Sequence, residues 1–471
     1  IFRYYSIMNY QVSQHIDNNK VFIVQRSEIE GRLDPKMALY NRKVQNSLYP
    51  KVKLKDVLVC KPQYGASEPG VPRSSIKEPR FIRITDIDEN GLISHDELGA
   101  TAKIIENKYI LCENDILIAR SGATVGKAYI HKPALYDCFF AGYLIRFIIN
   151  TDKALPEYIF TYTQLNAYKE WVNAIQRPSG QPNINSEEYQ SLEIPLPNIE
   201  RQQVIVDVIK SAYLQKKQKE SEAKQLLDNV DAYILNELGI TLPEIKTDLK
   251  NRIFKVNRSD LEDRLDPKFN KNYSFIKSLK GIYTWVTLRD VTFNNGQYGA
   301  NESAVEYKKG DIRYIRITDI DEYGNLKQTD KKTASNIEND YLLKPNDILF
   351  ARSGSVGRCY IHKFLEEQAI FAGYLIRYFL NENIIDADYL FYYCNSNIYK
   401  YWVDTIQRPA VQANINAQEY RSMPIPLPPI VKQKEIANHI YAMRQQAKQL
   451  QEEGESILEN AKKEVEQMIL V

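Results

Sequence analysis

The stretch at residues 197–239, PNIERQQVIVDVIKSAYLQKKQKESEAKQLLDNVDAYILNELG, determines how the rest of the chain is organised. Its apolar residues recur every three or four positions, which is the spacing of one helix face. Pro197 stands at the start, where its missing N–H is harmless, and Gly239 stands at the end, where a left-handed residue closes a helix. The spacing predicts one helix of about 55 to 60 Å, long enough to hold two domains apart.

The sequence before this helix is repeated after it. Residues 21–199 and 253–430 share, in the same order, RLDP, QYGA, IRITDIDE, NDIL-x-ARSG, FAGYLIR, IQRP, NIN and IPLP. The offset between matching residues drifts only between about 231 and 234, so the insertions are single loop residues. The chain is therefore predicted to contain two copies of one domain, the first and the second repeat.

A second amphipathic segment, residues 431–470, follows the second repeat. Two apolar stripes of matched length, each unable to bury itself alone, favour a coiled coil. Pseudo-two-fold, antiparallel pairing would give both repeats equivalent surroundings, whereas in the alternative each helix folds back on its own domain. Gly454 is expected to be a weak point, costing about 1 kcal/mol relative to Ala.

Each repeat is predicted to be an α/β (α+β) globule rather than a βαβ nucleotide fold. The predicted elements of the first repeat are strands at residues 80–88, 115–120, 127–132 and 143–150 and helices at residues 155–174 and 186–192. Tyr143 and Arg146, with Tyr374 and Arg377 in the second repeat, fall in an apolar strand pattern and are expected to be structural.

The composition, 44% hydrophobic and 26% charged, is that of a soluble globular protein. No window approaches eighteen apolar residues and no secretory pattern precedes the domains, so a cytoplasmic protein without a membrane segment is expected. The chain begins with Ile1, so either the native start is Met8 or the N-terminus is incomplete. The net charge is only +2, so a DNA-binding face must be a local patch, or a partner must supply charge.

No pattern of catalytic, metal-binding or nucleotide-binding residues is visible. The five cysteines and five histidines form no ligand cluster and no disulfide framework. SGATVGKA at residues 121–128 has three residues between its glycines instead of the four of a phosphate-binding loop, so it is predicted to be the turn of a strand-turn-strand hairpin.

Two similar domains, each with D-I-L-x-A-R-S-G in the middle and each closed by I-P-L-P and a long amphipathic helix, resemble the specificity (S) subunit of type I restriction-modification systems, which act in phage defence. The resemblance covers nearly the whole chain from Val21 onward. It implies target recognition domains at residues 21–197 and 253–428, spacer helices at 198–240 and 429–471, an N-terminal extension at 1–20 and a connector at 241–252.

The resemblance also implies the function and the partners. Each domain would read one half of a bipartite site on double-stranded DNA, and the helices would set the spacing of the half-sites and dock two methyltransferase subunits. Motor/endonuclease subunits would join through the methyltransferases. The chain itself would be non-catalytic and would bind no cofactor, because S-adenosylmethionine, ATP and magnesium belong to the partner subunits.

Comparison of the repeats divides the candidate DNA-contacting residues. If the half-sites differ, base-reading residues should lie in the loops that differ, at residues 67–80, 90–113 and 134–138 and at 301–313, 323–345 and 365–369, while shared residues contact phosphate or support the fold. Arg suits guanine edges or phosphates, and Gln and Asn suit adenine. The shared polar candidates are Gln63, Tyr64, Arg83, Thr85, Arg120, Ser121, Arg177, Gln181 and Asn183, with counterparts Gln297, Tyr298, Arg316, Thr318, Arg352, Ser353, Arg408, Gln412 and Asn414.

Three alternatives remain open at the level of sequence. The shared surface suggests that both repeats recognise the same or nearly the same short sequence, giving an interrupted palindrome. The same type of subunit could serve a fused restriction-methylation endonuclease, and the near-neutral charge would also suit a scaffold that binds only protein. Asp86, and Asp319 in the second repeat, would on the simplest interpretation pair with a neighbouring arginine inside the fold.

Overall fold

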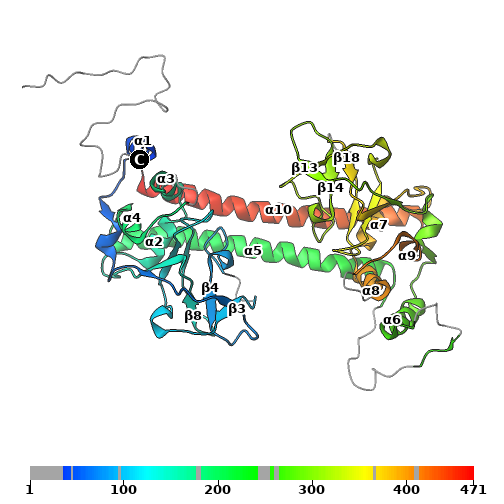
Figure 1. Cartoon of the computed structure of the whole chain (residues 1–471), viewed down its shortest axis with the longest axis horizontal. Coiled ribbons are helices and arrows are strands. Elements are labelled where there is room, and N and C mark those ends of the chain that lie inside the picture. The colour runs from blue at the N-terminus through cyan, green and yellow to red at the C-terminus, as the bar shows by residue number, and fades with distance from the viewer. Residues whose placement is uncertain are drawn as a thin grey trace, which may run out of the picture. The chain divides into compact units, whose positions relative to one another are not determined.

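The structure is a computed structural model (Figure 1), and it describes residues 35–43, 46–93, 97–176, 182–241, 255–258, 265–363, 367–407 and 413–470. The predicted N-terminal extension and nearly all of the predicted connector lie outside these residues. The chain forms two compact units. Unit 1 comprises residues 1–219 and 452–471, and unit 2 comprises residues 220–451. Each unit therefore contains one repeat and one half of each long helix.

Unit 1 is built on a four-stranded antiparallel sheet in the order β2-β9-β6-β7, with small two-stranded sheets β4-β8 (parallel), β3-β5 and β1-β10 around it. Its 3₁₀ turns are η2 (Leu54–Val57), η3 (Ile84–Asp86) and η4 (Asn107–Tyr109). Its strands and helices are α1 (Pro35–Lys43), β1 (Lys51–Lys53), β2 (Gln63–Tyr64), β3 (Gly70–Pro72), β4 (Arg80–Ile82), β5 (Ala100–Ala102), β6 (Ile116–Ala119), β7 (Ala128–Ile130), β8 (Cys138–Phe140), β9 (Leu144–Phe147), α2 (Pro156–Tyr162), α3 (Asn166–Ile175), α4 (Ser186–Gln190), β10 (Glu193–Pro195) and the start of α5 (Ile199–Glu237).

Unit 2 repeats this topology, with a four-stranded sheet in the order β12-β19-β16-β17 and pairs β14-β18, β13-β15 and β11-β20. Its 3₁₀ turns are η7 (Leu288–Val291), η8 (Ile317–Asp319) and η9 (Asn339–Tyr341). Its strands and helices are α6 (Pro267–Ser278), β11 (Trp285–Thr287), β12 (Gln297–Tyr298), β13 (Ala304–Glu306), β14 (Arg313–Ile315), β15 (Lys332–Ala334), β16 (Ile348–Ala351), β17 (Cys359–Ile361), β18 (Ala369–Phe371), β19 (Leu375–Tyr378), α7 (Ala387–Tyr393), α8 (Asn397–Ile406), α9 (Ala417–Arg421), β20 (Pro424–Pro426) and the start of α10 (Ile430–Ile469).

The two long helices pair antiparallel within each unit. In unit 1, Lys216 and Lys219 of α5 form ion pairs with Glu455 and Glu453 of α10, so partner numbers fall along α10 as they rise along α5. The predicted antiparallel helix pair is thereby confirmed. Apolar residues from both helices also join the core of the first repeat, so pairing and packing on the domain occur together.

A buried glutamine fixes the start of each long helix to its domain. The Gln202 side chain is fully buried; its Oε1 accepts a hydrogen bond from the Leu155 N–H at 2.8 Å and its Nε2 donates to the Pro197 carbonyl at 2.8 Å. The Leu155 N–H and the Pro197 carbonyl lie outside regular secondary structure, so a side chain must supply their hydrogen-bond partners. In unit 2, the Gln433 Oε1 accepts a hydrogen bond from the Asp386 N–H, and its Nε2 donates to the carbonyls of Ile384 and Pro428.

Several predicted elements are correct and two need correction. β6 pairs antiparallel with β7, so SGATVGKA is the turn of a hairpin as predicted. The strand predicted at residues 80–88 ends at Ile82, because the Asp86 carboxylate accepts the Arg83 N–H and caps the 3₁₀ turn η3. The helix predicted at residues 155–174 is two helices, α2 and α3, separated by a turn in which the Gln164 N–H donates to the Thr161 carbonyl.

Candidate nucleic-acid interface

Three backbone segments of the first repeat meet at one point, because a glycine allows them to cross closely. A Cβ on Gly65 would lie 2.2 Å from the Ala141 carbonyl oxygen, so no other residue fits there. The Ala66 N–H donates to the Phe140 carbonyl at 2.9 Å, and the Arg120 N–H donates to the Tyr143 carbonyl at 2.9 Å. The crossing therefore brings the residues after β2, after β6 and before β9 together.

At this crossing the guanidinium of Arg120 lies over the ring of Tyr64, 4.8 Å from its centroid. The Tyr64 hydroxyl accepts the N–H of Ser186, the first residue of α4, at 3.1 Å, which fixes the ring. We call this pair the Arg–Tyr stack. In the second repeat the stack consists of Arg352, 4.9 Å from the ring of Tyr298, whose hydroxyl accepts the Ala417 N–H at 3.2 Å.

Beside the stack is an exposed tyrosine that sequence reasoning assigned to the fold. Tyr143 is 65% exposed and Tyr374 is 63% exposed, and both precede their strand instead of lying in it. The prediction that they lie in an apolar strand is wrong. The glycine before each tyrosine, in FAGY, was the available indication of a turn, but the apolar residues on both sides concealed it.

Three other shared arginines among the described residues of the first repeat are buried or have partners within the protein. Arg80 is 1% exposed. Arg83 donates through Nε and Nη2 to the Asp86 carboxylate, and this hydrogen bonding raises the pKa of Arg83. Arg146 forms a buried ion pair with Asp115, which confirms its structural assignment. The counterparts Arg313, Arg316 and Arg377 are placed in the same way.

Arg120 and Arg352 differ from these arginines. Among the residues that the structure describes, no carboxylate lies within ion-pair distance of either guanidinium. A partly exposed arginine stacked on a fixed tyrosine, beside a second exposed tyrosine, offers cationic, hydrogen-bonding and stacking groups together. These are the groups that nucleic-acid interfaces use.

The remaining candidates fall into four groups. The Gln63 Oε1 accepts a hydrogen bond from Arg146, and its Nε2 donates to the Lys108 carbonyl. Gln297 makes the same contacts with Arg377 and the Asp340 carbonyl. Thr85 and Thr318 are exposed at the 3₁₀ turns. Ser121 and Ser353 are buried, and they form backbone bridges to Asn183 and Asn414, which are half-buried. Arg177, Gln181, Arg408 and Gln412 lie outside the described residues.

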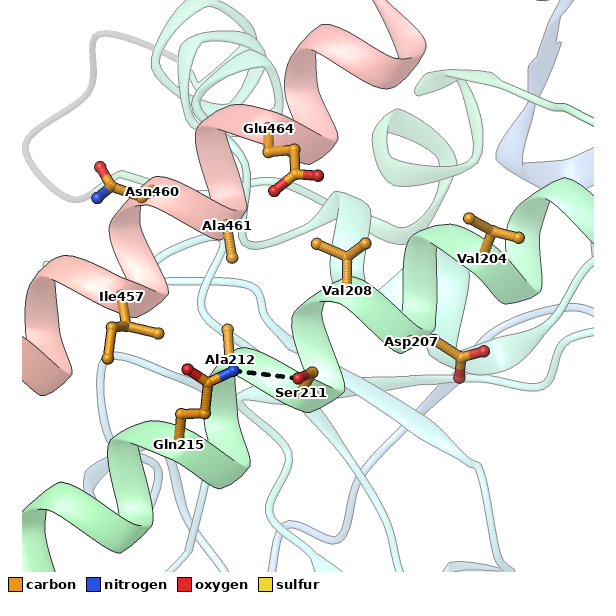
Figure 2. Close-up of a pocket in the computed structure, with 10 residues that line it drawn as sticks. All are labelled: Val204, Asp207, Val208, Ser211, Ala212, Gln215, Ile457, Asn460, Ala461 and Glu464. Atoms are coloured by element: carbon orange, nitrogen blue, oxygen red, sulfur yellow. Dashed lines mark hydrogen bonds between the residues drawn. The ribbon is translucent and has the colours of Figure 1, made fainter.

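A second candidate surface is a groove between the long helices in unit 1 (Figure 2). Its volume is about 650 Å³. Val208 and Ala212 of α5 face Ala461 of α10, and the Gln215 side chain donates to the Ser211 hydroxyl at 3.2 Å. The other lining residues are Val204, Asp207, Ile457, Asn460 and Glu464.

The equivalent place in unit 2 is occupied by two rings. Tyr233 stands where Glu464 stands in unit 1, and His439 stands where Val208 stands. Their ring centroids lie 4.2 Å apart. The two halves of the helix pair therefore present different surfaces.

Within the described part of the chain, no group of three or more His, Cys, Asp or Glu residues is arranged to hold a metal ion. None of the described helices is long and apolar enough to cross a membrane.

Comparison with known proteins identifies one family. The family model described as "Type I restriction modification DNA specificity domain" matches residues 80–226 and 283–456, which is more than half of the chain. The type I restriction enzyme MjaVIII specificity subunit of Methanocaldococcus jannaschii is 21% identical over 380 residues, covering 78% of this chain and 81% of its own. The EcoKI specificity subunit of Escherichia coli is 22% identical over 376 residues, covering 76% of this chain and 74% of its own. The structure of the S subunit of a type I system from M. genitalium covers 91% of this chain and 98% of its own, with 13% identity and a TM-score of 0.40.

Proposed function

The chain belongs to the type I restriction-modification DNA specificity family, and from that premise we propose that each of its repeats reads one half of a bipartite DNA site. The observation that carries the proposal is the Arg–Tyr stack, which is present at the equivalent place in both repeats and has no carboxylate partner among the described residues. A stack of this kind binds DNA with a guanidinium and aromatic rings, while the buried arginines hold the domain together.

The chain acts without catalysis of its own. S-adenosylmethionine, ATP and magnesium are bound by partner subunits, which methylate adenine and cut DNA. Because the net charge is only +2, binding depends on a local cluster of donors and on charge supplied by the methyltransferases.

The paired helices carry the methyltransferase subunits. The groove in unit 1 supports this proposal, since its apolar floor and polar rim suit an amphipathic helix of a partner. Two equivalent positions, one in each unit, would accommodate two methyltransferases, although the unit 2 position is lined by Tyr233 and His439 and would make different contacts.

DNA binding is tested with the assembled complex of this chain and its methyltransferase. Fluorescence anisotropy with duplex DNA at several salt concentrations should show affinity that falls steeply with salt. Arg120→Ala combined with Arg352→Ala should weaken binding while size-exclusion chromatography shows unchanged assembly. Salt-independent or absent binding by the wild-type complex would support a protein-only scaffold instead.

Helix docking is tested separately by filling the groove. Ser211→Arg places a long charged side chain in the groove at an exposed helix position, where arginine is well tolerated. It should weaken association with the methyltransferase at least tenfold in a pull-down titration. Lys210→Glu, one residue earlier and outside the groove lining, should leave association unchanged. If both variants assemble like wild type, the groove is not the docking site.

A further inference from the structure

The contacts that hold the loops differ between the two repeats, whereas the contacts at the Arg–Tyr stack are the same. In the first repeat, Arg73 anchors the loop after β3 by donating to the carbonyls of Leu98 and Glu78. In the second repeat, Tyr307 stands at this position after β13, and its hydroxyl donates to Glu367, which also accepts from Lys331 at 3.0 Å. Different anchors give different loop conformations, so the loops of the two repeats are suited to different base pairs.

At the stack, by contrast, each fixing contact is present twice. Arg120 is held at both ends of its backbone, since its N–H donates to Tyr143 and its carbonyl accepts the Ile184 N–H at 2.8 Å. Arg352 is held by Tyr374 and by the Ile415 N–H at 2.9 Å. The distances from guanidinium to ring differ by only 0.1 Å, as 4.8 Å and 4.9 Å.

We infer that the two half-sites share one G·C base pair at the same distance from the methylated adenine, read by Arg120 in one half-site and by Arg352 in the other. This inference rests on the proposed function. A guanidinium placed over a ring, with no carboxylate partner among the described residues, has its N–H donors available, and their fork matches the O6 and N7 acceptors of guanine in the major groove. The remaining base pairs of each half-site, read by the differing loops, are different.

A base contact explains the construction of the stack better than a phosphate contact. A phosphate can be bound by an arginine fork, but it accepts hydrogen bonds from many directions, so the point charge of a mobile lysine also serves it. Bidentate recognition of guanine uses two donors in one plane, and a guanidinium held over a ring is restricted in position before binding. Fixing the tyrosine through its hydroxyl makes the platform rigid as well.

The first test is the methylome of a strain in which this chain and its methyltransferase are the sole source of adenine methylation. We expect a bipartite motif with a G·C pair at one common offset from the methylated adenine in both halves. A bipartite motif without such a pair would overturn the inference and leave the proposed function intact. Absence of any bipartite motif would overturn the proposed function itself.

The second test changes one stack at a time and repeats the methylome. Arg120→Lys keeps the positive charge but lacks the fork, so it should lower the preference for the G·C pair in one half-site by roughly 5- to 150-fold. Arg352→Lys should do the same in the other half-site only. Lys55→Ala and Arg289→Ala, which change exposed cations at equivalent positions on η2 and η7, serve as controls and should leave the motif unchanged. If the lysine variants lose methylation uniformly with the motif intact, the stacks contact phosphate and the inference fails.

Discussion

Individual buried polar side chains hold this fold together, and in each repeat they occur at equivalent positions. Gln202 and Gln433 are both fully buried, and both satisfy backbone groups of two different segments. Asp115 and Arg146 form a buried ion pair at 3.3 Å, repeated by Asp347 and Arg377 at 3.1 Å. A buried polar group that loses its partner costs more than the hydrogen bond contributed, so these residues are sensitive positions.

Truncation of the buried glutamine should destabilise the protein strongly. Gln202→Ala leaves the Leu155 N–H and the Pro197 carbonyl without partners, and we expect a loss of about 1 to 3 kcal/mol for each unsatisfied group. Urea denaturation measures this loss. Gln203→Ala, at the exposed neighbouring position, is the control and should change the free energy of unfolding by less than about 0.5 kcal/mol. Equal effects at both positions would contradict this role.

The buried carboxylate gives a prediction about pH. Burial raises the pKa of Asp115, and the Cys112 N–H and the Arg146 guanidinium oppose that shift. A carboxyl with a higher pKa in the folded state binds its proton more tightly there, so its contribution to stability increases as the pH falls toward the unfolded pKa of about 3.9. Asparagine does not titrate. The free energy of unfolding of wild type minus that of Asp115→Asn should therefore increase from pH 7 to pH 4, and a decrease would show that the Arg146 contact outweighs burial.

At the scale of elements, the close approach of the long helices depends on small residues. Gly454 was expected to weaken α10, but the helix is continuous through it and Gly454 is buried against Lys216. A Cβ placed on Gly454 would meet Lys216 atoms at 3.4 and 3.5 Å, which is ordinary contact. Ala223, at the equivalent position of α5, is fully buried.

Gly454→Ala should consequently stabilise the protein. Alanine has a higher helix propensity by about 1 kcal/mol, and the space accepts its methyl group. Thermal denaturation of the full chain should show a higher Tm. Gly454→Leu should lower the Tm, because a branched side chain would push Lys216 and its helix away. A lower Tm for the alanine variant would indicate that the contact cannot relax.

Elements and repeats could be predicted from sequence to the extent that they depend on local patterns. The helix at residues 197–239 shows its spacing and its caps, and the hairpin after β6 shows its glycines. The Arg–Tyr stack could not be predicted, because Tyr64 and Arg120 meet only when two strands cross at Gly65. Tyr143 was misassigned because the apolar residues on both sides concealed the turn at Gly142 and Tyr143 that precedes β9.

At the scale of the whole molecule, the long helices are proposed to set the distance between half-sites. Seven residues inserted after Lys219 and seven after Gln451, at the boundary between the units, add about two turns, or roughly 10.5 Å, to each helix. The spacer in the methylated motif should lengthen by about three base pairs with both half-sites unchanged. Long-read methylome sequencing measures both quantities. Loss of all recognition would mean that the helices belong to the reading core and do not act as a spacer.

The last turn of α10 completes the first unit. The Leu48 N–H donates to the Ile469 carbonyl at 3.1 Å, and the Ala167 N–H donates to the Glu466 carboxylate at 2.7 Å. During synthesis, residues 220–451 must all leave the ribosome before these partners exist. At roughly 5 to 20 residues per second, the first unit waits about ten to fifty seconds with the side of α5 that contacts α10 uncovered. The domain that is translated first is thus the one whose folding finishes last, and a truncated chain would leave it incomplete.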